Sequence, residues 1–162
     1  TTLFRSPLEE VVSYDIYNSI GSILQFTTKS GIPTTIIYGY KQTLPIAKIE
    51  GATYSQIMQT FNLSTTDYSS YLDLDIVKKS DLDVDELSEE NLLIALEAFR
   101  NNPDFKNVQI STYTYNPLIG LTSMTTPNGM KEFYIYNSEN KLEKVLDAEK
   151  NILKEYKYNY KQ

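Results

Sequence analysis

The sequence contains no cysteine, no histidine and no tryptophan among its 162 residues. Without cysteine and histidine there can be no disulfide, no thiolate or imidazole metal ligand, and no catalysis that depends on a cysteine nucleophile or a histidine base. The lack of cysteine does not fix the compartment, because such chains occur in oxidising and reducing environments alike. We therefore expect a chain that is not an enzyme, with no catalytic residues, no cofactor and no metal site.

Long apolar runs and an excess of basic charge are missing as well. No stretch of about 18 apolar residues could span a bilayer, and the N-terminal TTLFRSPLEE lacks the basic and apolar regions of a signal peptide. The chain does not begin with Met, so we expect it to be part of a longer protein that continues on its N-terminal side. The net charge of −6 argues against a nucleic-acid partner, which needs clustered Lys and Arg.

Tyrosine is the abundant residue, with 14 copies against six of Phe. Near the C-terminus the tyrosines come in pairs that recur about every 21 residues: Tyr113 and Tyr115, Tyr134 and Tyr136, Tyr156 and Tyr158. The members of a pair are two positions apart, so in a strand both side chains lie on the same face. Tyrosine suits such half-buried positions, where the ring packs and the hydroxyl finds a partner.

Turn signals separate the tyrosine pairs. Pro127 precedes Asn128-Gly129, a pair typical of a type I′ hairpin turn, in which both central residues need positive φ. The pattern predicts an antiparallel meander of five strands, at residues 108–115, 121–125, 130–136, 142–146 and 152–160.

The same unit occurs near the start of the chain, from Tyr14 to Tyr40. Tyr17-Asn18 matches Tyr115-Asn116 and Tyr136-Asn137, and the glycines at 21 and 31 match those at 120 and 129. We therefore expect β-structure of one kind at both ends of the chain.

The stretches YDIYNSIGSILQFTT and YTYNPLIGLTSMTTPNG resemble the YD repeat of RHS-type bacterial surface and toxin proteins. The resemblance covers about 14–50 and 108–160, and is greatest to C-terminal regions of long YD-repeat proteins of the Bacteroidetes. The units are degenerate, because Ser22 and Leu121 replace the arginine that follows glycine in the family pattern. The resemblance implies a strip of β-sheet of the kind that coils into a hollow shell, and an extracellular or cell-surface location.

Residues 52–101 break the β pattern. Tyr54, Ile57, Met58 and Phe61 form one apolar helical face, and Thr53 with Gln56 fits a capping box, which predicts a helix at 53–62. A second helix is predicted at 89–101, with Ser88 as N-cap, and further helical turns at 66–78.

The predicted fold class is thus α+β, mainly β. An antiparallel meander of YD-type hairpin units carries an inserted pair of short amphipathic helices that leans on one sheet face. We expect one domain over 1–162, with a β unit at 10–50, the helical insertion at 51–107 and the meander at 108–162.

Two groups of carboxylates were considered as sites. Asp81, Asp83 and Asp85 imitate the start of a calcium loop, but Glu86 and Leu92 stand where that loop needs Gly and a bidentate Glu. The pairing that sugar hydrolysis requires could come from Asp15, Asp104, Glu132 and Asp147, but no spacing marks two of them as facing each other.

These observations favour a non-catalytic structural or interaction region that extends or caps a β-shell, or docks to a partner such as export machinery or an outer-membrane carrier. Its edge strands, near 10–17 and 152–160, would offer unpaired backbone groups to the rest of a parent protein or to another protein. One alternative is a glycan-binding module that uses Tyr134 and Tyr136; a less favoured one is part of a toxin delivery protein.

Overall fold

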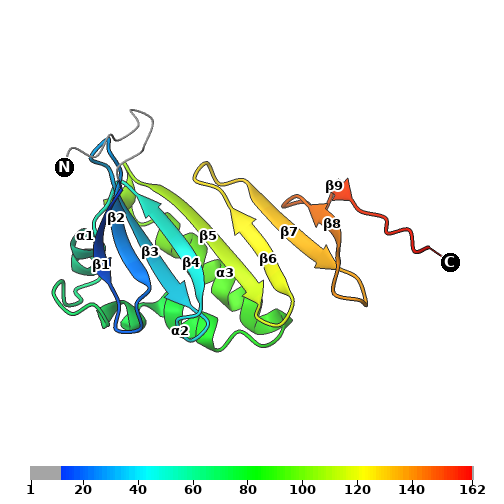
Figure 1. Ribbon diagram of the computed structural model, residues 1–162, viewed down its shortest axis with the longest axis horizontal. Helices are drawn as coiled ribbons and strands as arrows, with labels where there is room; N and C mark the ends of the chain where they lie inside the picture. The colour runs from blue at the N-terminus through cyan, green and yellow to red at the C-terminus, as the bar shows by residue number, and fades with distance from the viewer. Residues whose placement is uncertain (1–11, 162) are drawn as a thin grey trace, which may run out of the picture.

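The computed structural model describes residues 12–161, and they form one antiparallel sheet in which every strand pairs with its sequence neighbours (Figure 1). The strands are β1 Ser13–Tyr17, β2 Ile23–Thr27, β3 Pro33–Gly39, β4 Leu44–Glu50, β5 Gln109–Asn116, β6 Gly120–Thr125, β7 Lys131–Tyr136, β8 Leu142–Leu146 and β9 Ile152–Glu155. The predicted meander is confirmed. The N-terminal and C-terminal units also join directly, because β4 pairs with β5 through Ala47 opposite Thr112 and Ile49 opposite Ile110.

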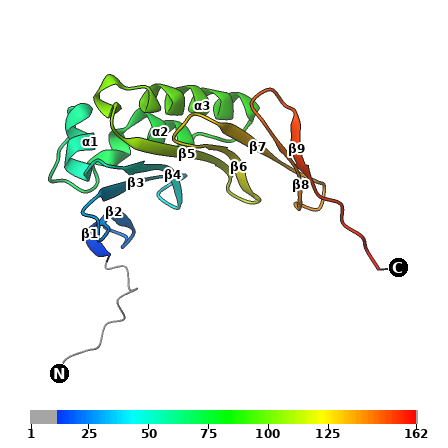
Figure 2. The same ribbon diagram turned by 90° about the horizontal axis from the view of Figure 1, so that it is seen from above.

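The segment between β4 and β5 is helical and lies on one face of the sheet (Figure 2). It contains α1 Tyr54–Thr60, α2 Asp75–Asp81 and α3 Glu86–Arg100, with the short 3₁₀ helices η1 Ser70–Asp73 and η2 Pro103–Phe105. The predicted pair of helices is therefore wrong in number, because the region around 66–78 forms a 3₁₀ turn followed by a full helix. Strands β8 and β9 extend beyond the helical layer in both views.

The N-terminal caps of α1 and α3 test the two caps predicted from the sequence. The capping box of α1 is confirmed, since Thr53 Oγ1 accepts from the Gln56 amide and Gln56 Oε1 accepts from the Thr53 amide. The predicted N-cap of α3 is wrong: Asp85 is the N-cap, and Ser88 lies at the third helical position and bonds back to the Asp85 amide. Helix α3 begins earlier than expected because this reciprocal pair satisfies its free amides.

Five of the hairpin turns share one geometry. The amide of the first residue donates to the carbonyl of the fifth, and the amide of the fourth donates to the carbonyl of the first. The first residues are Asn18, Thr28, Thr126, Asn137 and Asp147. The fourth residues all have positive φ: Gly21, Gly31, Gly129, Asn140 and Lys150.

The predicted type I′ turn is therefore wrong. Gly129 has φ +88°, but Asn128 is not among the residues with positive φ, so only one residue of the turn takes the left-handed conformation. In three of the turns an Asn or Asp side chain accepts from two amides inside the turn. Asn137 Oδ1, for example, accepts from Glu139 and Lys141. Asparagine and aspartate favour turns for this reason.

The core lies between the helices and the central strands. Ile37, Ile49 and Leu92 are fully buried there, together with the rings of Tyr54 and Tyr71. Both buried tyrosines keep their hydroxyls bonded; that of Tyr71 donates to Gln42 at 3.0 Å. The helical layer can approach the sheet closely because Gly39 has no side chain where Ser80 of α2 meets β3.

The two outer strands are shorter than expected. Strand β9 ends at Glu155 rather than at residue 160, since among residues 156–161 the Tyr156 amide is the only main-chain donor that bonds to β8, at Glu143. Strand β1 begins at Ser13; positions 10 and 11 of the predicted edge, like the N-terminal TTLFRSPLEE, lie outside the described residues.

Candidate functional site

A row of tyrosine hydroxyls crosses the sheet. The second tyrosine of each unit donates to a main-chain carbonyl of the strand before it: Tyr38 to Ile23 at 3.1 Å, Tyr115 to Pro45 at 2.7 Å, Tyr136 to Leu121 at 2.8 Å and Tyr158 to Leu142 at 2.7 Å. The same contact therefore recurs four times along the sheet. We call this set, together with Tyr17 at its start, the tyrosine row.

The acceptor residues are not arbitrary. Each is the residue opposite the tyrosine of its own hairpin: Tyr17 faces Ile23, Tyr38 faces Pro45, Tyr115 faces Leu121 and Tyr136 faces Leu142. The register shifts immediately before each of these tyrosines, as at a β-bulge. Each unit thus has a first strand with a tyrosine at or next to its last residue and a second strand with an apolar residue at or next to its first, whose carbonyl accepts from the next tyrosine.

The helical insertion does not interrupt the row. Tyr115 follows the insertion, yet its hydroxyl reaches Pro45 of the hairpin that precedes the insertion. The ring of Tyr115 also lies edge-on to Tyr40, with ring centroids 5.5 Å apart, and its amide donates to the Tyr40 hydroxyl. The contact that links two consecutive units therefore also links the two separated parts of the sheet.

Burial raises the pKa of several tyrosine hydroxyls in the sheet. It raises the pKa of Tyr38 and Tyr136, and raises that of Tyr115 to about 12. Burial, reinforced by the bond from its hydroxyl to Glu132, also raises the pKa of Tyr134 to about 12. A phenol with such a pKa is a neutral hydrogen-bond donor at physiological pH, so Tyr38, Tyr115 and Tyr136 donate across strands, whereas Tyr134 donates to Glu132 within β7.

The row is open at its first end. The Tyr17 side chain is 47% exposed on the edge strand β1, and within residues 12–161 its hydroxyl meets no carbonyl of a preceding strand. Beside it, Asp15 binds β1 to β2 by accepting from Gln25 and Thr27, and these bonds lower the pKa of its carboxyl group, that from Thr27 most. The edge strand is therefore firmly attached to the sheet while its outer side remains free in the described part of the chain.

The last end of the row carries an exposed aromatic cluster. Tyr156, Tyr158 and Tyr160 are 41%, 41% and 60% exposed and border a hollow of about 330 Å³. The Lys141 ammonium lies 5.2 Å from the Tyr158 ring centre and 4.8 Å from that of Tyr160, and the Tyr160 hydroxyl donates to Glu139. The polypeptide past β9 is thus fastened to the turn before β8 by side chains.

The carboxylates of the acidic run have separate structural tasks. Asp81 accepts from the Lys41 amide, Asp83 accepts from the Tyr40 hydroxyl and Asp85 caps α3. Among residues 12–161 no three Asp or Glu side chains are grouped so that they could hold a metal ion.

The four carboxylates that could serve sugar chemistry lie in separate parts of the structure. Asp15 ties β1 to β2, Asp104 lies in η2, Glu132 accepts from Tyr134, and Asp147 accepts two amides of its turn. Asp147 is therefore a turn residue. Hydrogen bonds from Asn151, chiefly that of its amide, lower the pKa of this carboxyl group.

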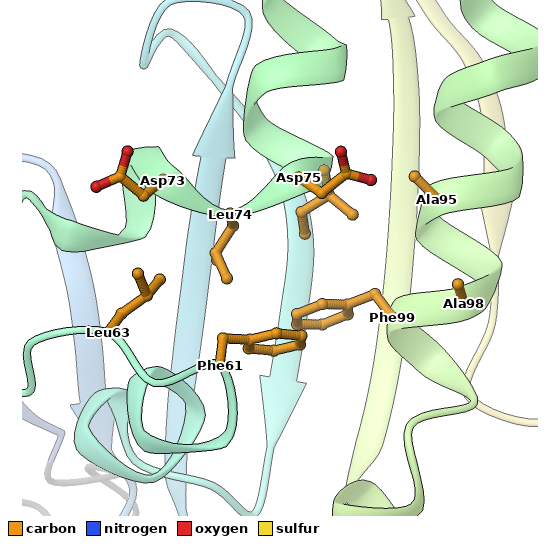
Figure 3. Close-up of a pocket in the computed structure, with 9 residues that line it drawn as sticks. Phe61, Leu63, Asp73, Leu74, Asp75, Ala95, Ala98 and Phe99 are labelled. Carbon is orange, nitrogen blue, oxygen red and sulfur yellow. The ribbon is translucent and has the colours of Figure 1, made fainter.

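A hollow of about 300 Å³ opens in the helical layer (Figure 3). Its floor contains Phe61 and Phe99, whose rings stack at 5.4 Å, and Asp73 and Asp75 stand at its rim. Both carboxylates are engaged, Asp73 with Lys78 at 3.3 Å and Asp75 with Lys79 at 2.5 Å. The hollow is therefore an apolar depression without a reactive group.

A wider groove runs between the start of α3 and strands β6 and β7. It comprises two adjoining hollows of about 550 and 620 Å³ that share Glu86, Glu89 and Thr122. Glu89 accepts from the hydroxyls of Thr114 and Thr122, so this half-buried carboxylate is tied to the sheet. The helical pattern at 89–101 does not reveal this tie, because Thr114 and Thr122 lie 25 and 33 residues after Glu89 in the sequence.

The hydroxyl-to-carbonyl contacts were also missed at the level of sequence, although a signal was present. Tyr38 lies 15 residues after Ile23 and Tyr136 lies 15 after Leu121. For these two tyrosines, an apolar residue 15 positions earlier would have identified the acceptor, whereas Tyr158 lies 16 positions after Leu142 and the helical insertion separates Tyr115 from Pro45 by 70.

Comparison with protein-family models gave no matching family, and comparison with curated proteins gave no match. None of the helices in residues 12–161 has the length and apolarity that crossing a membrane requires.

Proposed function

We propose that this chain is a non-catalytic structural and interaction region of a YD-repeat, RHS-like protein of the cell surface or secreted space. In this role it extends or caps a β-shell, or docks to a partner such as export machinery. The observation that carries the proposal is the tyrosine row, because four contacts of one kind link successive hairpins, and within residues 12–161 the first position, Tyr17, has no such contact at the sheet edge.

The arrangement of polar groups supports this function. Tyrosine hydroxyls, turn carboxylates and Glu89 are bonded to neighbouring strands or to their own turns, where they set strand register and hairpin geometry. Open edges of a sheet offer backbone groups to a further strand, which is the ordinary means by which β-repeats grow.

Two measurements test the proposal. The polypeptide encoded on either side of this chain should contain further units with a tyrosine pair about every 21 residues. Protease treatment of intact cells should cleave the region, and a tagged native protein should copurify with outer-membrane components if it docks to a carrier. Flanking sequence without such units, together with full protection in intact cells, would refute the proposal.

Glycan binding is a second candidate, favoured by the exposed rings of Tyr156, Tyr158 and Tyr160 around the terminal hollow. Planar rings with polar ends give contact area at low entropic cost. Tyr134 and Tyr136 are less suitable, because both hydroxyls are already bonded within the sheet. Signal on a glycan array that is lost in Tyr160→Ala and kept in Tyr134→Phe would support this candidate; an array without signal would count against it.

A further inference from the structure

We propose that the edge formed by residues 155–158 binds a second strand of a further YD-like unit, with a defined register and residue pattern. The inference rests on the proposed function and specifies its partner. In the described chain β9 has β8 on one side and no strand on the other. The proposed binding edge is the outer side of residues 155–158, which continue β9 and include Tyr156 and Tyr158.

The internal repeat defines what this edge lacks. In β7, residues 131–133 pair with β6 and residues 133–136 pair with β8. The stretch Tyr156-Lys157-Tyr158-Asn159 corresponds to Tyr134-Ile135-Tyr136-Asn137. Pairing of β9 with β8 ends at Glu155, and the Tyr158 hydroxyl already donates to Leu142 as Tyr136 does to Leu121. Residues 155–158 therefore correspond to residues 133–136 of β7, which pair with β8. In the described chain they have no second strand in the place that β8 takes beside β7.

The second strands within the chain show what residue pattern fits. Opposite the two tyrosines of β7 stand Val145 and Leu142, and opposite those of β5 stand Met124 and Leu121. The occupant therefore carries apolar residues three positions apart, with a bulge between them. Its first apolar residue faces Tyr158 and the second faces Tyr156.

Charge adds a second criterion. Lys157 takes the place of Ile135, which faces Lys144 in β8. An acidic residue immediately before the second apolar position would face Lys157, and opposite charges at facing positions stabilise antiparallel pairs. The fitting strand thus reads apolar, any residue, acidic, apolar.

Within residues 12–161, the free edge of a second copy does not fit the pattern. The other edge, β1, is also a first strand, with Tyr14 and Tyr17 where the occupant needs apolar residues. Joining the two edges would place two first strands side by side. Tyr17 would then lack a carbonyl in the position in which Leu142 offers one to Tyr158. The occupant is therefore a second strand from a further repeat unit.

The test extends the full chain beyond Gln162 with a copy of residues 141–147 in which Lys144→Glu is introduced. Because Asn159 corresponds to Asn137, this extension brings the copied Leu142 opposite Tyr158 across a turn of native length. The matched control inserts one additional residue before the copied Lys141, which shifts the register and turns the side chains to the opposite faces.

Hydrogen exchange at the amides of Glu155, Lys157 and Tyr158 is the readout, since the Tyr156 amide already donates to Glu143, and sedimentation velocity reports assembly. We expect exchange at least about tenfold slower in the extended chain than in the shifted control. Equal exchange in the two chains overturns the inference, as does a dimer of the unextended chain that protects these amides. Neither outcome depends on the cellular location or flanking sequence that tests the proposed function.

Discussion

The contact between Gly120 and Tyr136 offers a direct test of the tyrosine row. Gly120 has φ +152°, and a Cβ added there would lie 2.9 Å from the Tyr136 hydroxyl oxygen and 3.5 Å from Cζ. That hydroxyl donates to the carbonyl of Leu121 at 2.8 Å. In Gly120→Ala the new methyl group therefore competes with the oxygen atom that joins two hairpins.

Two contributions determine the size of the effect. Alanine in a backbone conformation that glycine favours costs on the order of 1–3 kcal/mol. Loss of the hydroxyl-to-carbonyl bond adds roughly 0.5–1.5 kcal/mol. We expect Gly120→Ala to lower the free energy of unfolding by about 2–4 kcal/mol, and the melting temperature by roughly 4–16 °C for a chain of this size.

A double-mutant cycle separates the two contributions. Tyr136→Phe removes the oxygen and makes room for the methyl group, so Gly120→Ala should cost about 1 kcal/mol less in the Phe background. Urea denaturation of the four proteins measures this coupling. Gly129→Ala is the matched control, because Gly129 has φ +88° but no atom lies within 4 Å of the added Cβ. It should be destabilising without coupling to Tyr136→Phe, and strictly additive effects of Gly120→Ala and Tyr136→Phe would refute the reasoning.

Three other perturbations test neighbouring parts of the structure. Burial raises the pKa of Tyr115 from 10.0 to about 12, so the stabilisation that the buried neutral phenol contributes is complete below pH 10 and is lost as pH rises toward 12. Urea midpoints should therefore fall across that interval less steeply in Tyr115→Phe than in the parent. Parallel profiles of the two proteins would contradict this. Thr53→Ala should cost about 1 kcal/mol in thermal denaturation by removing the cap of α1, whereas Thr53→Ser should leave stability nearly unchanged. Gly39→Ala should cost roughly 1–3 kcal/mol, because the added Cβ would collide with the side chain of Ser80 and lie 2.9 Å from Ile46 Cγ2; Ser80→Gly should restore part of the loss, and no recovery would show that Ser80 is not the obstacle.

Local features of the sequence determined the repeating secondary structure. The tyrosine pairs and the turn residues between them predict the meander, and the strand at 142–146 has the predicted bounds. The capping box of α1 was also readable, because its four polar groups lie within four consecutive residues. The reason is that strand alternation, turns and caps depend on interactions between residues a few positions apart.

Where local signals compete, the sequence misleads. Asp85 was considered as part of an imitation calcium loop and Ser88 as a cap, but only together, as cap and third helical residue, do they satisfy the free amides at the start of α3. The turn at Asn128-Gly129 likewise follows a five-residue geometry that it shares with four other hairpin turns, which places the positive φ on Gly129 alone.

The candidate site itself was decided by tertiary structure. Tyr115 bonds to Pro45 across the whole helical insertion, and that contact exists only because β4 and β5 pair and the register shift before Tyr115 sets the direction of its ring. The sequence shows how many tyrosines there are and at what intervals they occur. Which carbonyl each hydroxyl meets follows from the order and register of the strands, since these alone bring residues distant in sequence to within hydrogen-bonding distance.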